Sequence, residues 1–368
     1  MQSGNTIYIA IVGVGGVGRH VIAQLHLISK EYPNLRLCHI SRSKKSLYAQ
    51  DFEQPLPFDS WEHDLAQTGQ DPLSLDGLLK YLASAPGKSV VVDNTSSSDV
   101  AAAYPMFLKQ GISVVTPNKK AFSGSLELWK DIFNSVRSPS NPTGGYVYHE
   151  SSVGAGLPII STLKDLVDTG DEVARIEGVF SGTMSFLFNT FAPVQGNGGV
   201  WSDEVRRAKA AGFTEPDPRE DLNGLDVARK LVILARISGL DIQNTSSFPV
   251  QSLIPKELES VKSADEFMEG LPRFDGTMAS MRDDANAQGK VVRFVGSIDV
   301  KKAVLNVGIQ TFDKSHPIAA LKGSDNIISF YTKRYGSNPL IVQGGGAGGE
   351  VTAMGVTADL IKVIQRLS

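Results

Sequence analysis

This 368-residue chain contains one cysteine, has a small net charge and has only short apolar runs. Its single cysteine, Cys38, excludes an intrachain disulfide, and no Cys/His cluster has the spacing of a zinc site, so we expect a protein of a reducing compartment, the cytoplasm. The 36 basic and 39 acidic residues leave a formal net charge of -3, which gives no general attraction to nucleic acid or to an anionic membrane. The longest apolar run near the N-terminus, Ile7–Val14, is too short to span a bilayer.

The composition is that of a globular protein, with 41% hydrophobic and 20% charged residues, and the length predicts two domains. The first 120 residues alternate short apolar runs with helical patterns, which predicts a doubly wound parallel sheet of the Rossmann type. The expected strands are 7–12, 35–40, 89–93 and 112–115, and the expected helices are about 17–28, 75–82 and 99–109.

A loop rich in Pro, Ser and Gly, 138–145, and a strand-like stretch, 146–150, end this region, so we expect one domain over 1–150 and a second over 151–343. Strands in the second domain do not alternate one by one with helices, which predicts an α+β open sheet. The expected strands are about 172–181, 290–299, 302–311 and 326–333, and the expected helices are about 156–168, 183–191, 202–211 and 223–238. A glycine-rich loop, Gly344–Gly349, precedes a last helix at about 350–366, and we expect residues 344–368 to pack back on the first domain.

A G-x-G-x-x-G motif lies between the first strand and the first helix, which is the place where it can bind a dinucleotide. The first glycine allows the tight turn, the second lets the backbone approach a pyrophosphate, and the third lets the helix pack on the strand. The helix N-terminus then faces the phosphate charge. The motif consists of Gly13, Val14, Gly15, Gly16, Val17 and Gly18.

The end of the second strand lacks the acid that would bind the ribose 2'-hydroxyl of NAD. Ser41 and Arg42 stand there instead, followed by Lys44 and Lys45, and Arg42 offers bidentate geometry to a 2'-phosphate. We therefore expect a preference for NADP(H), with NAD(H) possible. A solvated basic loop is the alternative interpretation of the same residues.

A loop with two prolines precedes the helix at about 223–238 and holds Glu215 and Asp217 in one arrangement, because proline restricts the backbone on both sides of each acid. In the helix, Asp226 and Lys230 are four residues apart and share a face. Spacing alone leaves two interpretations open for this pair, an exposed ion pair and a part of an active site.

Several motifs in order along nearly the whole chain resemble homoserine dehydrogenase in its short, monofunctional fungal form. They are Asp93-Asn-Thr-Ser, Thr116-Pro-Asn-Lys-Lys120, His149-Glu150 with Val153-Gly-Ala-Gly-Leu-Pro158, Phe180-Ser-Gly-Thr183, Gly212-Phe-Thr-Glu-Pro-Asp-Pro and Asp221-Leu-Asn-Gly-Leu-Asp-Val-Ala-Arg-Lys230. Bacterial members usually have Asn at the position of Ser185, so the resemblance assigns this serine no role.

The resemblance implies reversible hydride transfer between NAD(P)H and L-aspartate 4-semialdehyde, giving L-homoserine for threonine, methionine and isoleucine biosynthesis. An ammonium group can stabilise and protonate the oxygen of a reduced aldehyde. Lys230 matches the family's catalytic lysine, and Lys119 matches a second lysine near substrate and nicotinamide. Glu215 and Asp226 match the substrate-binding acids, with Asp226 near the reacting oxygen. The small-molecule substrate is thus expected to lie in the second domain.

The same resemblance implies cofactor, cation and partner sites. Thr95, Lys119 and Gly348 match positions that line the nicotinamide cofactor. A simple turn before the last helix is the alternative interpretation of Gly348. A monovalent cation, usually sodium, is implied at four positions, and a homodimer paired through the second domain is implied as well. The cation positions are Glu150, Val153, Ala155 and Leu157. His149, without a partner at His-x-x-x-His spacing, is expected to be structural.

Two rival functions make different predictions. Aspartate-semialdehyde dehydrogenase needs a cysteine nucleophile, and Cys38, at the end of the second strand, is in the wrong place for one. A catalytically silent NADP-sensing protein would keep the dinucleotide site, but it gives no reason for Lys119, Glu215, Asp226 and Lys230 to occur together.

Overall fold

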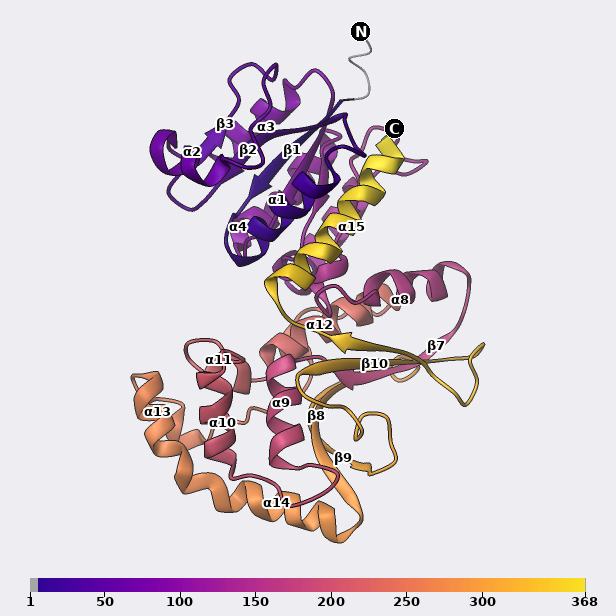
Figure 1. The fold of residues 1–368 in the computed structure, drawn as a ribbon. Helices are drawn as coiled ribbons and strands as arrows, with labels where there is room; N and C mark the ends of the chain where they lie inside the picture. Colours follow the sequence, from indigo (N-terminus) through magenta and orange to yellow (C-terminus); the bar gives the residue numbers. More distant parts are fainter. Residues whose placement is uncertain (1–5, 368) are drawn as a thin grey trace. The chain divides into compact units, whose positions relative to one another are not determined.

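Figure 1 shows the computed structural model of the chain, in which residues 6–367 are described. The chain divides into two compact units, Met1–Gly156 with Gly348–Ser368, called unit 1 here, and Leu157–Ala347, called unit 2. The domain boundaries expected from the sequence, 150/151 and 343/344, lie a few residues from the boundaries of these units. The assignment of cofactor binding to one part and of substrate binding to the other stays a prediction.

Unit 1 is built on a six-stranded sheet in the order β3-β2-β1-β4-β5-β6. All neighbours are parallel except the edge pair β2 and β3, and the central strands are apolar and buried on both faces, as parallel sheets require. The strands are β1 (Ile7–Val12), β2 (Leu35–Ser41), β3 (Ser46–Tyr48), β4 (Lys88–Asp93), β5 (Ser113–Val115) and β6 (Val147–Tyr148). The predicted doubly wound Rossmann-type sheet is confirmed.

Short helices connect these strands. They are α1 (Gly16–Ile28), α2 (Trp61–Thr68), α3 (Leu75–Ala83), α4 (Ser98–Ala102), α5 (Tyr104–Lys109), α6 (Lys120–Ser123) and α7 (Leu126–Ser135), with the 3-10 turn η2 (Glu150–Ser152). The last helix, α15 (Gly349–Leu367), lies beside α1, and its apolar residues share a core with β1 and β4 (Figure 1). Gln24 of α1 ties the two helices by accepting a 2.8 Å hydrogen bond from Thr357.

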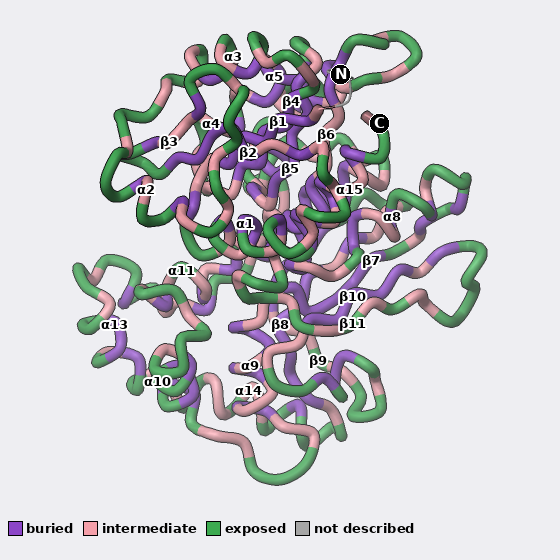
Figure 2. The backbone as a smooth tube through the Cα atoms, turned by 45° about the horizontal axis from the view of Figure 1, so that its top comes forward, coloured by how far each residue is buried: buried purple, intermediate pink, exposed green. Residues whose placement is uncertain are grey.

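Unit 2 contains a five-stranded sheet in the order β11-β10-β7-β8-β9, in which all neighbours are antiparallel. The strands are β7 (Val173–Val179), β8 (Lys290–Asp299), β9 (Val304–Asp313), β10 (Asp325–Thr332) and β11 (Leu340–Gly345). The helices and 3-10 turns are α8 (Ile159–Asp168), α9 (Gly182–Phe191), α10 (Trp201–Ala210), α11 (Arg219–Leu222), α12 (Leu225–Ile237), η3 (Thr245–Ser247), η4 (Lys256–Leu258), α13 (Ala264–Gly270), η5 (Leu271–Phe274) and α14 (Asp275–Ala287). This is the predicted α+β open sheet, and Figure 2 shows buried backbone along β7, β8 and β10.

Three expected elements differ from the structure. The helix expected at 99–109 is broken at Ala103, because Pro105 can stand in the first turn of a new helix but not within a longer one. The strand expected at 146–150 has only two paired residues, and its end becomes η2. The glycine-rich loop expected over Gly344–Gly349 is partly strand, since Gly344 and Gly345 pair with β10.

The helices of the described part of the chain, residues 6–367, include none with the length and apolar character needed to cross a membrane.

Candidate functional site

The glycine-rich turn of unit 1 has the local geometry that a dinucleotide needs. Gly13 has φ +88, and a side chain at Gly18 would place its Cβ 2.1 Å from the carbonyl oxygen of Gly13. Gly15 and Gly16 face open space, because a Cβ at either would meet no atom within 4 Å. The N-cap of α1 is Gly15, which supplies no capping side chain. The turn therefore leaves room for a pyrophosphate at the helix N-terminus.

Neighbouring segments hold this turn in place. The carbonyl of Ser41 accepts hydrogen bonds from the N–H groups of Gly13 and Val14, at 3.0 Å and 3.2 Å. A Cβ on Gly349 would lie 2.9 Å from the carbonyl oxygen of Gly16, so the start of α15 is packed against the start of α1. Gly348, which has φ +118, makes the turn into α15 beside the nucleotide loop.

A buried hydrogen-bond network lies at the carboxyl ends of β4 and β5, next to Thr95 and Lys119 in the chain. Asp93 accepts from the hydroxyl of Tyr104 at 2.5 Å, from the amide of Asn118 at 3.1 Å and from the N–H of Thr95 at 2.7 Å. Burial raises the pKa of the Asp93 carboxyl, against these hydrogen bonds, which lower it. The sequence pattern does not predict this network, although an acid that ends a buried strand is a signal for a supporting role.

The corner at the end of β2 contains the arginine expected at a 2'-phosphate. Nη2 of Arg42 lies 3.0 Å from Oε1 of Glu62, and its guanidinium lies 5.8 Å from the ring centroid of Trp61. Lys45 bonds instead to the carbonyl of Ala66 at 2.7 Å. A carboxylate is therefore present at this corner, supplied by α2 and not by the end of β2.

Lys230 of unit 2 is buried. Its ammonium donates to the carbonyl of Phe180 at 2.6 Å and lies 2.7 Å from Oδ2 of Asp226. Its side chain is only 8% exposed, against 42% for Asp226. The interpretation as an exposed ion pair is thus wrong for Lys230, which is buried between a carboxylate and a carbonyl.

The loop that carries Glu215 is anchored to the same segment, 180–183. Asp221 accepts from the N–H of Glu215 at 2.8 Å and from the hydroxyl of Thr183 at 3.0 Å. Burial raises the pKa of the Asp221 carboxyl. Because Phe180 binds Lys230 and Thr183 binds Asp221, the structure brings the exposed Glu215 and the buried Lys230 to one end of α9. Spacing did not identify Asp221, since its two partners lie in separate segments.

Two neighbouring residues have structural roles. Asp217 is engaged by the guanidinium of Arg219 at 2.6 Å and shapes the proline-containing loop. Ser185 is buried on α9, and its hydroxyl accepts from the amide of Asn189 one turn later at 3.2 Å.

The turn after β6 contains three of the four residues expected at a cation. Gly154 and Ala155 both have positive φ, 78 and 55, and alanine in this region is strained. Glu150 is buried, and Lys362 lies 3.9 Å from its carboxylate. Among residues 6–367, no cluster of three His, Cys, Asp or Glu side chains could hold a metal, so a cation here would depend on backbone carbonyls. One carboxylate with carbonyl oxygens is a donor set that fits a hard monovalent ion.

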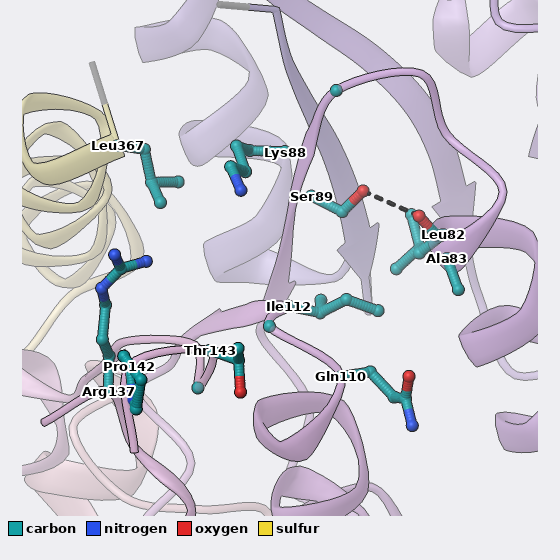
Figure 3. A pocket seen from close by; sticks show the side chains of 13 residues that line it. Leu82, Ala83, Lys88, Ser89, Gln110, Ile112, Arg137, Pro142, Thr143 and Leu367 are labelled. Carbon is teal, nitrogen blue, oxygen red and sulfur yellow. Dashed lines mark hydrogen bonds between the residues drawn. The ribbon is translucent and has the colours of Figure 1, made fainter. Parts of the chain in front are cut away.

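Two further features lie apart from this chemistry. His149 stacks on Phe122 with ring centroids 3.9 Å apart and bonds Ser152 at 3.0 Å, as expected of a structural histidine. A pocket of about 380 Å³ lies at the start of β4 and β5, lined by Lys88, Ile112 and Arg137 among others (Figure 3). Ligands of doubly wound sheets bind at the carboxyl ends of the strands, so this pocket is not the dinucleotide crevice.

Comparisons with known proteins cover both units. Residues 158–361 match the family profile described as homoserine dehydrogenase, and residues 13–141 match the one described as homoserine dehydrogenase, NAD binding domain. A homoserine dehydrogenase of Paracoccidioides brasiliensis is 55% identical over 376 residues, covering 100% of both chains.

Solved structures extend this likeness to the fold. A Candida auris protein, described as of unknown function, has a TM-score of 0.91 at 45% identity and covers 98% of this chain and 99% of its own. A hyperthermophilic archaeal homoserine dehydrogenase in complex with NADPH has a TM-score of 0.71 at 22% identity, with 98% of each chain covered. The latter likeness concerns the fold alone.

Proposed function

The chain belongs to the homoserine dehydrogenase family, and we propose that it catalyses the reversible NAD(P)H-dependent reduction of L-aspartate 4-semialdehyde to L-homoserine. The observation that carries this function is the buried Lys230, held by Asp226 and Phe180 at the end of α9 that also anchors Glu215. A catalytically silent NADP-binding protein has no support from the relatives.

The nicotinamide cofactor binds in unit 1, with NADP(H) preferred. The turn of Gly13 to Gly18, where Gly15 and Gly16 leave open space, would hold its pyrophosphate. Thr95, Lys119 and Gly348 would line the nicotinamide side, and Ser41 and Arg42 would contact the adenosine ribose and its phosphate. When bound, the cofactor supplies a hydride to the aldehyde or accepts one from the alcohol.

The chain's own residues orient the substrate and manage the proton. The ammonium of Lys230 faces the substrate oxygen, stabilises the charge that develops there and delivers the proton. Asp226 holds this ammonium in place, and Glu215 accepts from the amino group of the substrate. Lys119, which matches the family's second lysine near substrate and nicotinamide, adds a second positive charge.

Other functional properties come from the family resemblance. The product serves threonine, methionine and isoleucine biosynthesis in the cytoplasm, and the chain forms a homodimer through unit 2. Glu150 and the carbonyls of Val153, Ala155 and Leu157 would hold a sodium ion. The strained φ of Ala155 is the structural feature that supports this ion.

The direct test is the change of absorbance in the NADPH band when the purified chain is mixed with NADP and L-homoserine. We expect NADPH formation that requires both compounds and is absent with L-serine, which is one methylene shorter. Binding of NADPH without any turnover of homoserine would instead favour the silent binding protein.

Arg42→Ala tests the cofactor preference. We expect the KM for NADPH to rise about tenfold or more, since charge-assisted bonds to a phosphate are lost, while the KM for NADH stays within about twofold. Initial rates with each cofactor at saturating substrate give both values. An equal rise in the KM values for NADPH and NADH would contradict a contact between Arg42 and the 2'-phosphate.

Asp221→Ala tests how the Glu215 loop is held. This variant lacks the carboxylate that accepts from the N–H of Glu215, so the Glu215 loop is less firmly held. We expect the KM for homoserine to rise about tenfold and the Kd for NADPH to stay unchanged. Asp221→Asn should retain most of the affinity for homoserine, because its amide oxygen can still accept from that N–H while its NH2 group faces Thr183. If both variants lose activity equally, the negative charge of Asp221 matters and its role is not to position Glu215.

A further inference from the structure

One carboxylate joins two arginines at the adenosine end of the nucleotide site. Oε1 of Glu62 lies 3.0 Å from Nη2 of Arg42 and 3.5 Å from Nη2 of Arg19. The three side chains come from different elements of unit 1: Arg19 from the first turns of α1, Arg42 from the end of β2 and Glu62 from the first turn of α2. The contact therefore depends on the fold and not on helical spacing.

The surroundings of the contact are those of an anion site. Two guanidinium groups on one oxygen are the arrangement that binds phosphate oxygens, because the planar donors match that anion. The side chain of Arg42 also lies over the buried Trp61, which limits where its guanidinium can point. A carboxylate in this position satisfies the arginines with one negative charge, whereas a phosphate monoester carries about two.

We propose that Glu62 is an internal counter-ion for Arg19 and Arg42, which the 2'-phosphate of NADP(H) must displace and which NAD(H) can leave in place. Glu62 thereby sets the ratio of affinities for the two cofactors, and Arg19 is a second ligand of the 2'-phosphate. This inference rests on the proposed function, in which Arg42 faces that phosphate.

Displacement of Glu62 is physically inexpensive. The three side chains are about half exposed, at 53%, 44% and 59% for Arg19, Arg42 and Glu62, so water can solvate the displaced carboxylate. Glu62 also lies in the first turn of α2, whose N-cap Ser60 makes no side-chain capping bond, and the helix dipole favours a carboxylate there in any rotamer.

The test compares 2',5'-ADP with 5'-AMP as probes, because these ligands differ in the 2'-phosphate and need no catalysis. Their Kd values, measured by titration calorimetry, are compared for the wild-type chain, Glu62→Gln, Glu62→Ala and Glu53→Gln. The last is the matched control, since Glu53 is an exposed glutamate of the same unit that lies outside the cluster. Thermal unfolding checks that each variant is folded.

We expect both Glu62 variants to bind 2',5'-ADP about fivefold more tightly and 5'-AMP unchanged, with the gain falling as salt rises from about 0.05 M to about 0.5 M. Arg19→Gln should weaken only 2',5'-ADP, and adding it to Glu62→Gln should reverse the gain. Glu53→Gln should change neither ligand.

Two results would overturn the inference, and they have different consequences for the proposed preference for NADP(H). If the wild-type chain prefers 2',5'-ADP but the Glu62 variants do not change its Kd, Glu62 is only a surface ion pair and the proposed cofactor preference stands. If the wild-type chain binds 5'-AMP as tightly as 2',5'-ADP, the preference for NADP(H) fails together with the inference.

Discussion

Lys230→Ala should lower kcat by roughly 10²-fold or more while the Kd for NADPH stays near the wild-type value. The developing alkoxide needs a positive charge and a proton at one place, and the ammonium held by Asp226 and the Phe180 carbonyl supplies both. Cofactor binding makes no such demand on this side chain. Steady-state rates with homoserine and NADP, together with NADPH titration, separate the two effects.

The buried position of Lys230 calls for a control on folding. Removing the ammonium leaves the Phe180 carbonyl without this donor, so Tm should also fall, and kcat must be measured well below the new Tm. Lys230→Arg keeps a charge but is larger and cannot readily give up a proton, so it should not restore the rate. A lowered Tm with an unchanged kcat would mean that Lys230 and Asp226 have only a structural role.

The second lysine can be tested against the first. Lys119→Ala should also slow the reaction, and the double variant should cost less than the product of the two single losses if both lysines act on one oxygen. Strictly multiplicative losses would place the two lysines on different groups of the substrate or the cofactor.

Gly18→Ala should weaken NADPH binding by on the order of 10²-fold and lower the stability of unit 1. Its Cβ would lie 2.1 Å from the carbonyl oxygen of Gly13 and 3.0 Å from the carbonyl carbon, and backbone atoms cannot rotate away as a flexible side chain can. The helix must therefore move off the strand and displace the turn. A misplacement of about 1 Å costs on the order of 10²-fold in a site of this kind.

The same substitution at a glycine with open space around it is the control for this prediction. At Gly276 in α14, a Cβ would meet nothing within 4 Å, so Gly276→Ala should leave NADPH binding unchanged and raise stability by up to about 1 kcal/mol through helix propensity. NADPH fluorescence titration and thermal unfolding of the two variants provide the comparison. Normal binding by Gly18→Ala would show that the turn can relax and that this glycine is not needed for packing.

Local patterns were sufficient for the dinucleotide turn and for the two classes of sheet. A glycine motif between an apolar strand and an amphipathic helix specifies its own geometry, because φ, helix start and close packing are all properties of adjacent residues. The same is not true of α14, which sequence analysis missed: its polar sequence, DGTMASMRDDANA, lacks a clear apolar stripe, and tertiary contacts determine its helix.

The sequence by itself therefore determined the candidate residues that we propose for the chemistry: the turn from Gly13 to Gly18, Arg42, and Glu215, Asp226 and Lys230. Only the tertiary structure decided their environments. It buried Lys230 against Phe180, joined Asp221 to both Thr183 and Glu215, and placed Glu62 between Arg19 and Arg42. The physical reason is that burial and ion pairing depend on which distant segments meet, whereas the pattern along a chain reports only on neighbours within a few residues.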